Sequence, residues 1–142
     1  IPLALKAKGR PLPGHVIAFS PWLDMENRGA TLVTNDATDA LISVPLLEGM
    51  IAGVLGATTS PSAPLANPLY ADFTGFPPLY VNAGSVESLV DNAIRVAERA
   101  KGAGVDVTLH VAEGQQHVYP FLAGRDADVD AELAAIGQWL RH

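Results

Sequence analysis

Two acids and one histidine in the second half of this sequence have the residue types needed for proton transfer. Glu87 and Asp91 lie in the segment "GSVESLVD", and His117 ends the segment "EGQQH". A carboxylate within hydrogen-bond reach of a histidine fixes the tautomer of the ring, and it stabilises the imidazolium that forms when the ring takes a proton from a nucleophile. A single loop histidine is more often a solvated or capping residue, so position alone leaves both interpretations of His117 open.

The surrounding pattern predicts the elements that would hold these residues. Short apolar runs at "HVIAFSPW", "LYVNAG" and 105–111 are typical of strands, the first two buried on both faces. Helices are expected at 3–8, from Ser43 with Pro45 in the first turn, at 91–101, and at 126–139. The segments 24–42 and 57–78 are expected to be irregular, the second because it is rich in proline. Strands that alternate with helices predict an α/β fold with a parallel sheet and right-handed crossovers.

Three loops leave the carboxyl ends of the expected strands, where the chemistry of such sheets lies. They are "SPWLD", "GSVESLVD" and "EGQQHVYPF", and they bring Trp22, the two carboxylates and His117 to one rim. The acid loop and the histidine loop follow consecutive strands, so we expect them to be neighbours. Two interpretations of Trp22 stay open, contact with a substrate and packing in the core.

Of the two acids, Glu87 is the better candidate partner for His117. Glu87 directly follows the "NAGSV" that leaves the strand, where a side chain still points over the rim of the sheet. Asp91 falls at the expected start of a helix, where a carboxylate can serve as a cap. We therefore expect a Glu87 carboxylate oxygen at about 2.6 to 3.2 Å from an imidazole nitrogen of His117, most simply Nδ1.

Composition and charge exclude several classes of protein. Nine Lys and Arg residues against fifteen Asp and Glu give a net charge of −6, the wrong sign for phosphate backbones, so no nucleic-acid partner is expected. The lack of cysteine excludes disulfides, thiolate metal sites and cysteine nucleophiles, and it fits a reducing, cytoplasmic location. No apolar stretch reaches the roughly 18 residues of a membrane span. The first residues do not resemble a signal peptide.

The remaining acidic and histidine residues carry no predicted chemistry. The acidic run 126–132 is expected to be a helix N-terminus and a solvated face, and no metal site is expected because no histidine supports its carboxylates. His15, His110 and His142 are expected to have no chemical role.

Long stretches of the sequence resemble one known family. "HVIAFSPWLDM", "SPSAPLANPLYADFTGFPPLYVNAGSVESLVDNAIRVAERAKGAGVDVTLHVAEGQQHVYPF" and "AELAAIGQWLR" closely resemble the C-terminal part of bacterial hormone-sensitive-lipase-type esterases, in the α/β-hydrolase superfamily. The resemblance implies hydrolysis of carboxylic esters by a Ser-acid-His triad, with no metal and no cofactor. Within it His117 matches the catalytic histidine, Glu87 the position of the acid, and the Ser-Pro-Trp segment a loop near the site. Family spacing also favours Glu87, which precedes His117 by 30 residues, over Asp91, which precedes it by 26.

Two motifs of that family are absent from the sequence. They are the oxyanion motif His-Gly-Gly-Gly and the nucleophile elbow Gly-x-Ser-x-Gly, since no serine here lies between two glycines at that spacing. The resemblance therefore implies that residues 1–142 are the C-terminal part of an α/β-hydrolase domain, starting shortly after the nucleophilic serine, and that this part alone is inactive. The expected partners are a small-molecule ester, the missing N-terminal half and, as an alternative, another copy of the chain.

Two alternative functions stay open from the sequence. One is a non-catalytic α/β module that uses the hydrolase framework for binding or assembly. The other is a lactonase or amidase of the same superfamily, which would share the triad and differ in the pocket.

Overall fold

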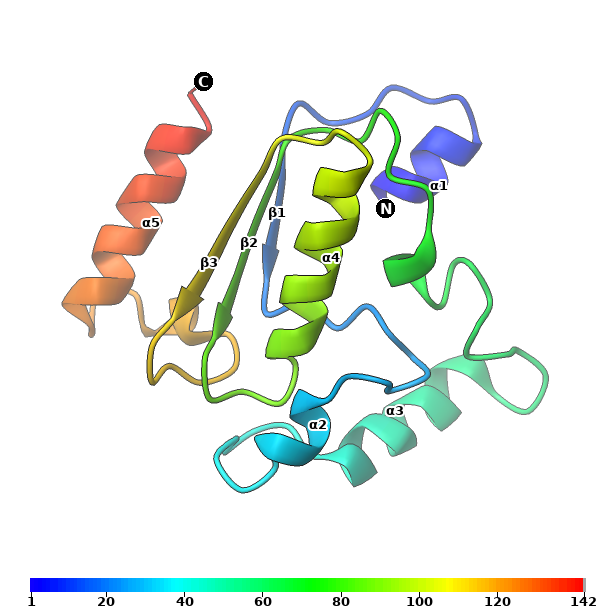
Figure 1. Ribbon diagram of the computed structural model, residues 1–142, viewed down its shortest axis with the longest axis horizontal. Helices are drawn as coiled ribbons and strands as arrows, with labels where there is room; N and C mark the ends of the chain where they lie inside the picture. The colour runs from blue at the N-terminus through cyan, green and yellow to red at the C-terminus, as the bar shows by residue number, and fades with distance from the viewer. Residues whose placement is uncertain (142) are drawn as a thin grey trace.

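The computed structural model describes residues 1–141, so His142 lies outside the described residues. Its elements follow the order expected for an α/β fold (Figure 1). Along the chain they are α1 (Pro2–Ala7), β1 (Val16–Phe19), α2 (Thr31–Thr34), α3 (Val44–Leu55), the 3₁₀ turn η1 (Pro68–Tyr70), β2 (Leu79–Gly84), α4 (Val90–Gly102), β3 (Val107–Ala112), the 3₁₀ turn η2 (Tyr119–Leu122) and α5 (Ala127–Trp139).

The three strands form one parallel sheet in the order β1-β2-β3, as predicted. Val16 pairs with Leu79 and Leu79 with Val107, so the strands begin level with one another. All six residues of the central strand β2 are buried, whereas β1 is only partly buried. The prediction that the first strand is buried on both faces is therefore wrong for the described chain, in which β1 lies at an edge and pairs only with β2.

Helices cover both faces of the sheet. Alternate residues of a strand point to opposite faces, and in β2 the residues Leu79, Val81 and Ala83 join the apolar core with α4, which crosses that face in Figure 1. The α4 residues in this core include Ala93, Val96 and Ala100. Tyr80 and Asn82 point the other way, where the phenol oxygen of Tyr80 donates to Glu132 of α5 and its ring meets Trp139 edge-on at 5.5 Å.

Four details of the helices differ from the prediction. The short helix α2 lies in a stretch expected to be irregular, and Ser43 stands at the N-cap of α3 without a side-chain capping bond. Ile94 of α4, expected on the same side of the helix as Ala97 and Ala100, is 36% exposed, whereas those two alanines are buried. Glu132, expected on a solvated face, is buried because Tyr80 and Asn82 each donate to its Oε1 and because His110 pairs with Oε2.

Among residues 1–141, no helix is long and apolar enough to cross a membrane.

Candidate active site

The carboxyl ends of the three strands meet at one rim of the sheet, at the ends of the arrows in Figure 1. Ser20 directly follows β1, Gly84 ends β2, and Ala112 ends β3. The register pairs Phe19 with Asn82 and Gly84 with Ala112, so the loop from each strand starts beside the next. The three loops are thus neighbours, as predicted; their sequences are "SPWLD", "GSVESLVD" and "EGQQHVYPF".

Gly84 allows the histidine loop to cross the end of β2. A Cβ at this position would lie 2.0 Å from the carbonyl oxygen of Gln115, far inside van der Waals contact. Hydrogen bonds fix the same crossing: Ser85 N donates to Ala112 O at 2.9 Å, and Gly114 N donates to Ser85 Oγ at 2.8 Å. Only glycine fits here, and that close approach brings His117 over the acid loop.

Glu87 is completely buried at the centre of the rim. Its Oε2 accepts hydrogen bonds from Ser20 Oγ at 2.7 Å and from Gly84 N at 2.9 Å. Burial of a carboxylate is costly unless hydrogen bonds or a charge compensate it. Two donors on one oxygen supply that compensation and leave Oε1 free for a further partner.

That further partner is His117. Its Nδ1 lies 3.5 Å from Glu87 Oε1, and 17% of the His117 side chain is exposed. The expected pairing and the expected nitrogen are both found, but the distance is longer than the predicted about 2.6 to 3.2 Å. Two donors hold the carboxylate by its other oxygen, and acid–base contacts of this kind are often long without substrate and tighten in the complex.

Asp91 is engaged elsewhere. Its Oδ2 pairs with the Arg95 guanidinium at 3.1 Å, one turn further along α4. The prediction that Asp91 caps this helix is wrong, because the N-cap residue is Leu89 and no side chain caps it. Asp91 instead lies in the first turn, where its charge still favours the helix dipole.

Trp22 lies between the rim and the helices that follow it. Its ring is partly buried against a small apolar cluster of Leu32, Leu47 and Leu89. Its indole N–H donates to Asp24 O at 3.2 Å and to Asn27 Oδ1 at 3.3 Å. These contacts describe a packed, hydrogen-bonded tryptophan, and contact with a substrate stays a prediction.

Asp24 anchors the Trp22 loop to α4 and is fully buried. Arg95 donates to its Oδ2 at 3.0 Å, and the backbone N–H groups of Glu26 and Arg28 donate to the two carboxylate oxygens. Burial raises the pKa of Asp24, but the Arg95 and backbone hydrogen bonds outweigh burial and hold that pKa below its ordinary value. The sequence alone predicts only that Asp24 caps the turn after Trp22, because its partner Arg95 lies 71 residues further along the chain.

Tyr119 begins η2, two residues after His117, and lies near Glu87. It is buried, and burial raises its pKa to about 12, with the nearby Glu87 carboxylate acting in the same direction. Asn82 Nδ2 donates to its phenol oxygen at 3.2 Å. The phenol is therefore neutral at ordinary pH and adds no charge next to Glu87.

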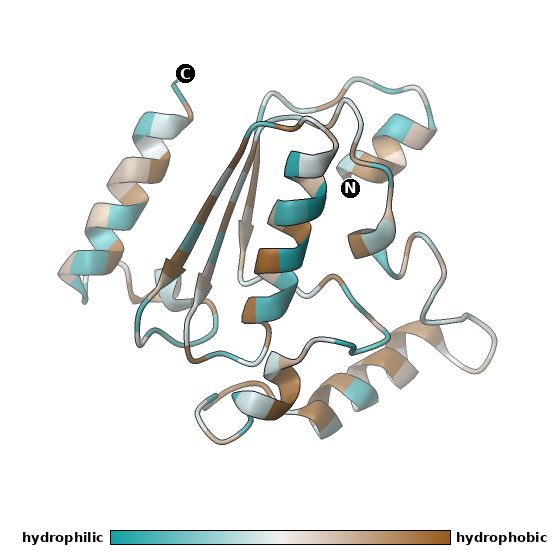
Figure 2. Ribbon diagram, in the orientation of Figure 1, coloured by the Kyte–Doolittle hydropathy of each residue, from teal (hydrophilic) through white to brown (hydrophobic). Residues whose placement is uncertain are grey.

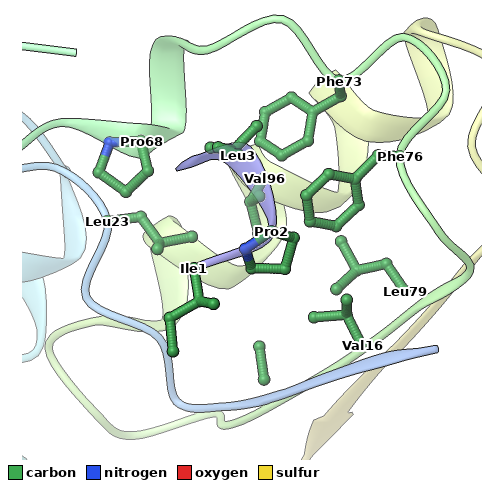
Figure 3. A pocket seen from close by; sticks show the side chains of 11 residues that line it. Ile1, Pro2, Leu3, Val16, Leu23, Pro68, Phe73, Phe76, Leu79 and Val96 are labelled. Carbon is green, nitrogen blue, oxygen red and sulfur yellow. The ribbon is translucent and has the colours of Figure 1, made fainter. Parts of the chain in front are cut away.

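Among residues 1–141, no group of three or more His, Asp or Glu residues is placed to hold a metal ion. An apolar cavity of about 160 Å³ lies between α1, β1 and α4, lined by side chains that include Leu3, Val16, Phe73 and Phe76 (Figure 3). Neither Glu87 nor His117 lines it.

Comparison with known proteins identifies the family of this chain. A family model described as the alpha/beta hydrolase fold matches residues 1–121. The chain belongs to the α/β-hydrolase family. An acetyl-hydrolase of Streptomyces hygroscopicus is 38% identical over 116 residues, which are 82% of this chain and 38% of that protein. An esterase of Acinetobacter venetianus is 31% identical over 139 residues, 96% of this chain and 46% of that protein.

A solved structure shows the same relationship in three dimensions. An esterase from the bacterial hormone-sensitive lipase family is 40% identical and superposes with a TM-score of 0.94, covering 99% of this chain and 47% of that one. The predicted resemblance and fold class are confirmed. The chain spans less than half the length of each of these three α/β hydrolases.

Proposed function

We propose that this chain supplies the acid and the base of a Ser-acid-His triad in a carboxylic-ester hydrolase. The observation that carries the proposal is the pair of Glu87 and His117: a buried carboxylate with one oxygen held by two donors and the other facing a partly buried imidazole. In these roles Glu87 orients the ring and stabilises the imidazolium, and the remaining ring nitrogen of His117 takes the proton of a nucleophile.

The nucleophile and the oxyanion donors belong, in this proposal, to the segment that the longer relatives carry outside the matched region. The serines of residues 1–142 lack the Gly-x-Ser-x-Gly setting. Loss of a nucleophile and its oxyanion donors removes most of the transition-state stabilisation, so residues 1–142 alone should not hydrolyse esters. No metal or cofactor takes part in this chemistry.

A joined protein tests the proposal. In it, this chain follows an N-terminal half of the family, taken from its own reading frame or from the 40%-identical esterase. We expect p-nitrophenyl acetate or butyrate hydrolysis by the joined protein, none above a heat-killed control by residues 1–142 alone, and loss of activity in the joined His117→Ala variant. Activity of the joined protein that survives His117→Ala would rule out His117 as the base.

A further inference from the structure

Ser20 is the residue directly after β1, and it takes no part in the acid–base pair itself. It is buried, with 3% of its surface exposed, and its backbone φ is +43°, in the left-handed region that side chains other than glycine seldom adopt. Such conformations persist when surrounding contacts hold them, and they are frequent at functional sites.

The contacts that hold Ser20 run to both partners of the pair. Its Oγ donates to Glu87 Oε2 at 2.7 Å, and the backbone N–H of Val118 donates to the same Oγ at 2.9 Å. A hydroxyl has one proton to donate and lone pairs to accept, so both bonds form together. Val118 directly follows His117 and also has a positive φ, of +50°.

We propose that Ser20 is a positioning residue that holds the carboxylate of Glu87 and the backbone beside His117 in a fixed position relative to each other. The inference rests on the proposed function, because it concerns how the acid and the base are held. With Ser20 and Gly84 both bound to Oε2, the carboxylate cannot turn without breaking two hydrogen bonds, and Oε1 stays directed at His117. The bond from Val118 then limits how far the ring can move away from that oxygen.

Ser20 is not itself placed to attack a substrate. Its proton is directed at Glu87, and its side chain is enclosed at the rim. A nucleophilic serine needs a base on its hydroxyl and an exposed oxygen. The geometry therefore separates Ser20 from the role of nucleophile.

Two substitutions separate the effect of the Ser20 hydroxyl from the effect of the backbone conformation. Ser20→Gly removes the hydroxyl and adopts a positive φ without strain, whereas Ser20→Ala removes the hydroxyl and keeps the Cβ. Ser88→Ala is the matched control: Ser88 is 1% exposed and adjacent to Glu87, but its hydroxyl faces Ile42 O at 3.5 Å.

The measurement is kcat and KM for p-nitrophenyl butyrate in the joined protein, with thermal unfolding of each variant. We expect Ser20→Gly and Ser20→Ala to lower kcat by about 10- to 100-fold with KM nearly unchanged, because a misplaced catalytic pair mainly slows the chemical step. Ser20→Gly should unfold at a temperature no lower than Ser20→Ala, because both lose the hydroxyl but glycine adopts the positive φ without strain, and Ser88→Ala should keep its kcat. Ser20→Cys, which retains a weak donor, should keep more activity than Ser20→Ala.

A kcat in Ser20→Gly equal to that of the parent would overturn this role. A raised KM with an unchanged kcat, or an equal fall of kcat in Ser88→Ala, would also overturn it. The variants Glu87→Gln and His117→Ala, measured beside them, show whether the proposed triad or only the role of Ser20 is wrong. If those two are fully active, the proposed triad itself is wrong; if they are inactive while Ser20→Gly is fully active, only the positioning role is wrong.

Discussion

Glu87 and Asp91 are four positions apart, yet their surroundings give them different roles. Glu87 is buried with His117, Ser20 and Gly84 around its carboxylate, whereas Asp91 is partly exposed and paired with Arg95. In the joined protein, Glu87→Gln should lower kcat on the order of 10³- to 10⁴-fold, because an amide holds the ring in the wrong tautomer, with little change in folding.

Asp91→Asn is the matched comparison for that variant. It should keep kcat and lower the free energy of unfolding by about 0.3 to 1 kcal/mol, through the lost Arg95 pair and the helix dipole. Steady-state kinetics and urea unfolding of both variants check the assignment. The reverse pattern, with Asp91→Asn inactive and Glu87→Gln active, would transfer the role of acid to Asp91.

The sequence predicted the pair at the rim but not the residue that holds it. Glu87 and His117 are visible in sequence because each lies in the loop that leaves a recognisable strand, and parallel strands bring such loops together. Ser20 is visible only in the fold, since its partners Glu87 and Val118 lie 67 and 98 residues away along the chain. A serine at the end of a strand carries no local signal for contacts of that range.

At the scale of elements, the site depends on how closely the histidine loop crosses β2. Gly84→Ala would place a Cβ 2.0 Å from Gln115 O and 2.4 Å from Gln115 C, so the loop must shift. We expect Gly84→Ala to cost about 1 to 3 kcal/mol of folding free energy. We also expect kcat to fall with it, because His117 moves away from Glu87.

Gly53→Ala serves as the control for this substitution. Gly53 lies within α3, and a Cβ there meets nothing within 4 Å. Alanine in a helix is favoured over glycine by about 0.5 to 1 kcal/mol, so this variant should be as stable as the parent or more stable, with its kcat unchanged. Urea unfolding and kcat measured on both variants test the crossing. An unfolding free energy and a kcat of Gly84→Ala equal to those of the parent would contradict it.

The elements themselves were largely predictable, and the errors share a cause. Apolar runs and capping signals located the sheet and the longer helices, because periodicity reports burial within one element. Glu132 was misplaced on a solvated face because its partners Tyr80 and Asn82 come from another element. Ser43 has a capping residue type but makes no capping bond, which only the local geometry decides.

At the scale of the whole molecule, Asp24 ties together three segments far apart in the chain. Arg95 of α4 donates to it at 3.0 Å, Asn67 Nδ2 at 3.3 Å and Tyr70 OH at 3.4 Å. Because its pKa is lowered in the folded state, its charge stabilises the fold above the unfolded Asp pKa of about 3.9, and this contribution is lost as pH falls through the lower folded value.

Acid unfolding should therefore reveal the Asp24 anchor. In the joined protein, the free energy of unfolding should decrease as pH falls below about 4, and the decrease should be shallower in Asp24→Asn. Asp39, whose pKa is also lowered by backbone N–H groups despite its partial burial, should account for part of the remaining slope. Equal slopes in the parent and Asp24→Asn would show that Asp24 does not contribute.

The described chain exposes an edge strand and several apolar side chains on its surface. β1 pairs only with β2 within residues 1–141, and Phe19 at its end is 36% exposed. Apolar side chains also face outward along α3, where Leu46, Met50 and Val54 are 45%, 47% and 70% exposed, and Figure 2 shows the apolar colour along this helix. Unpaired edges and apolar patches of this kind favour a further partner, in our account the N-terminal half.

The most direct test of the central claim is to find where the nucleophile lies. A fluorophosphonate reacts covalently with a serine activated by a neighbouring base, and mass spectrometry of the joined protein locates the adduct. We expect the adduct on a serine outside residues 1–142, formed at a rate that falls by orders of magnitude in His117→Ala and in Glu87→Gln. An adduct on a serine within residues 1–142, or labelling that is equally fast in both variants, would contradict the claim that this chain supplies the acid and the base but not the nucleophile.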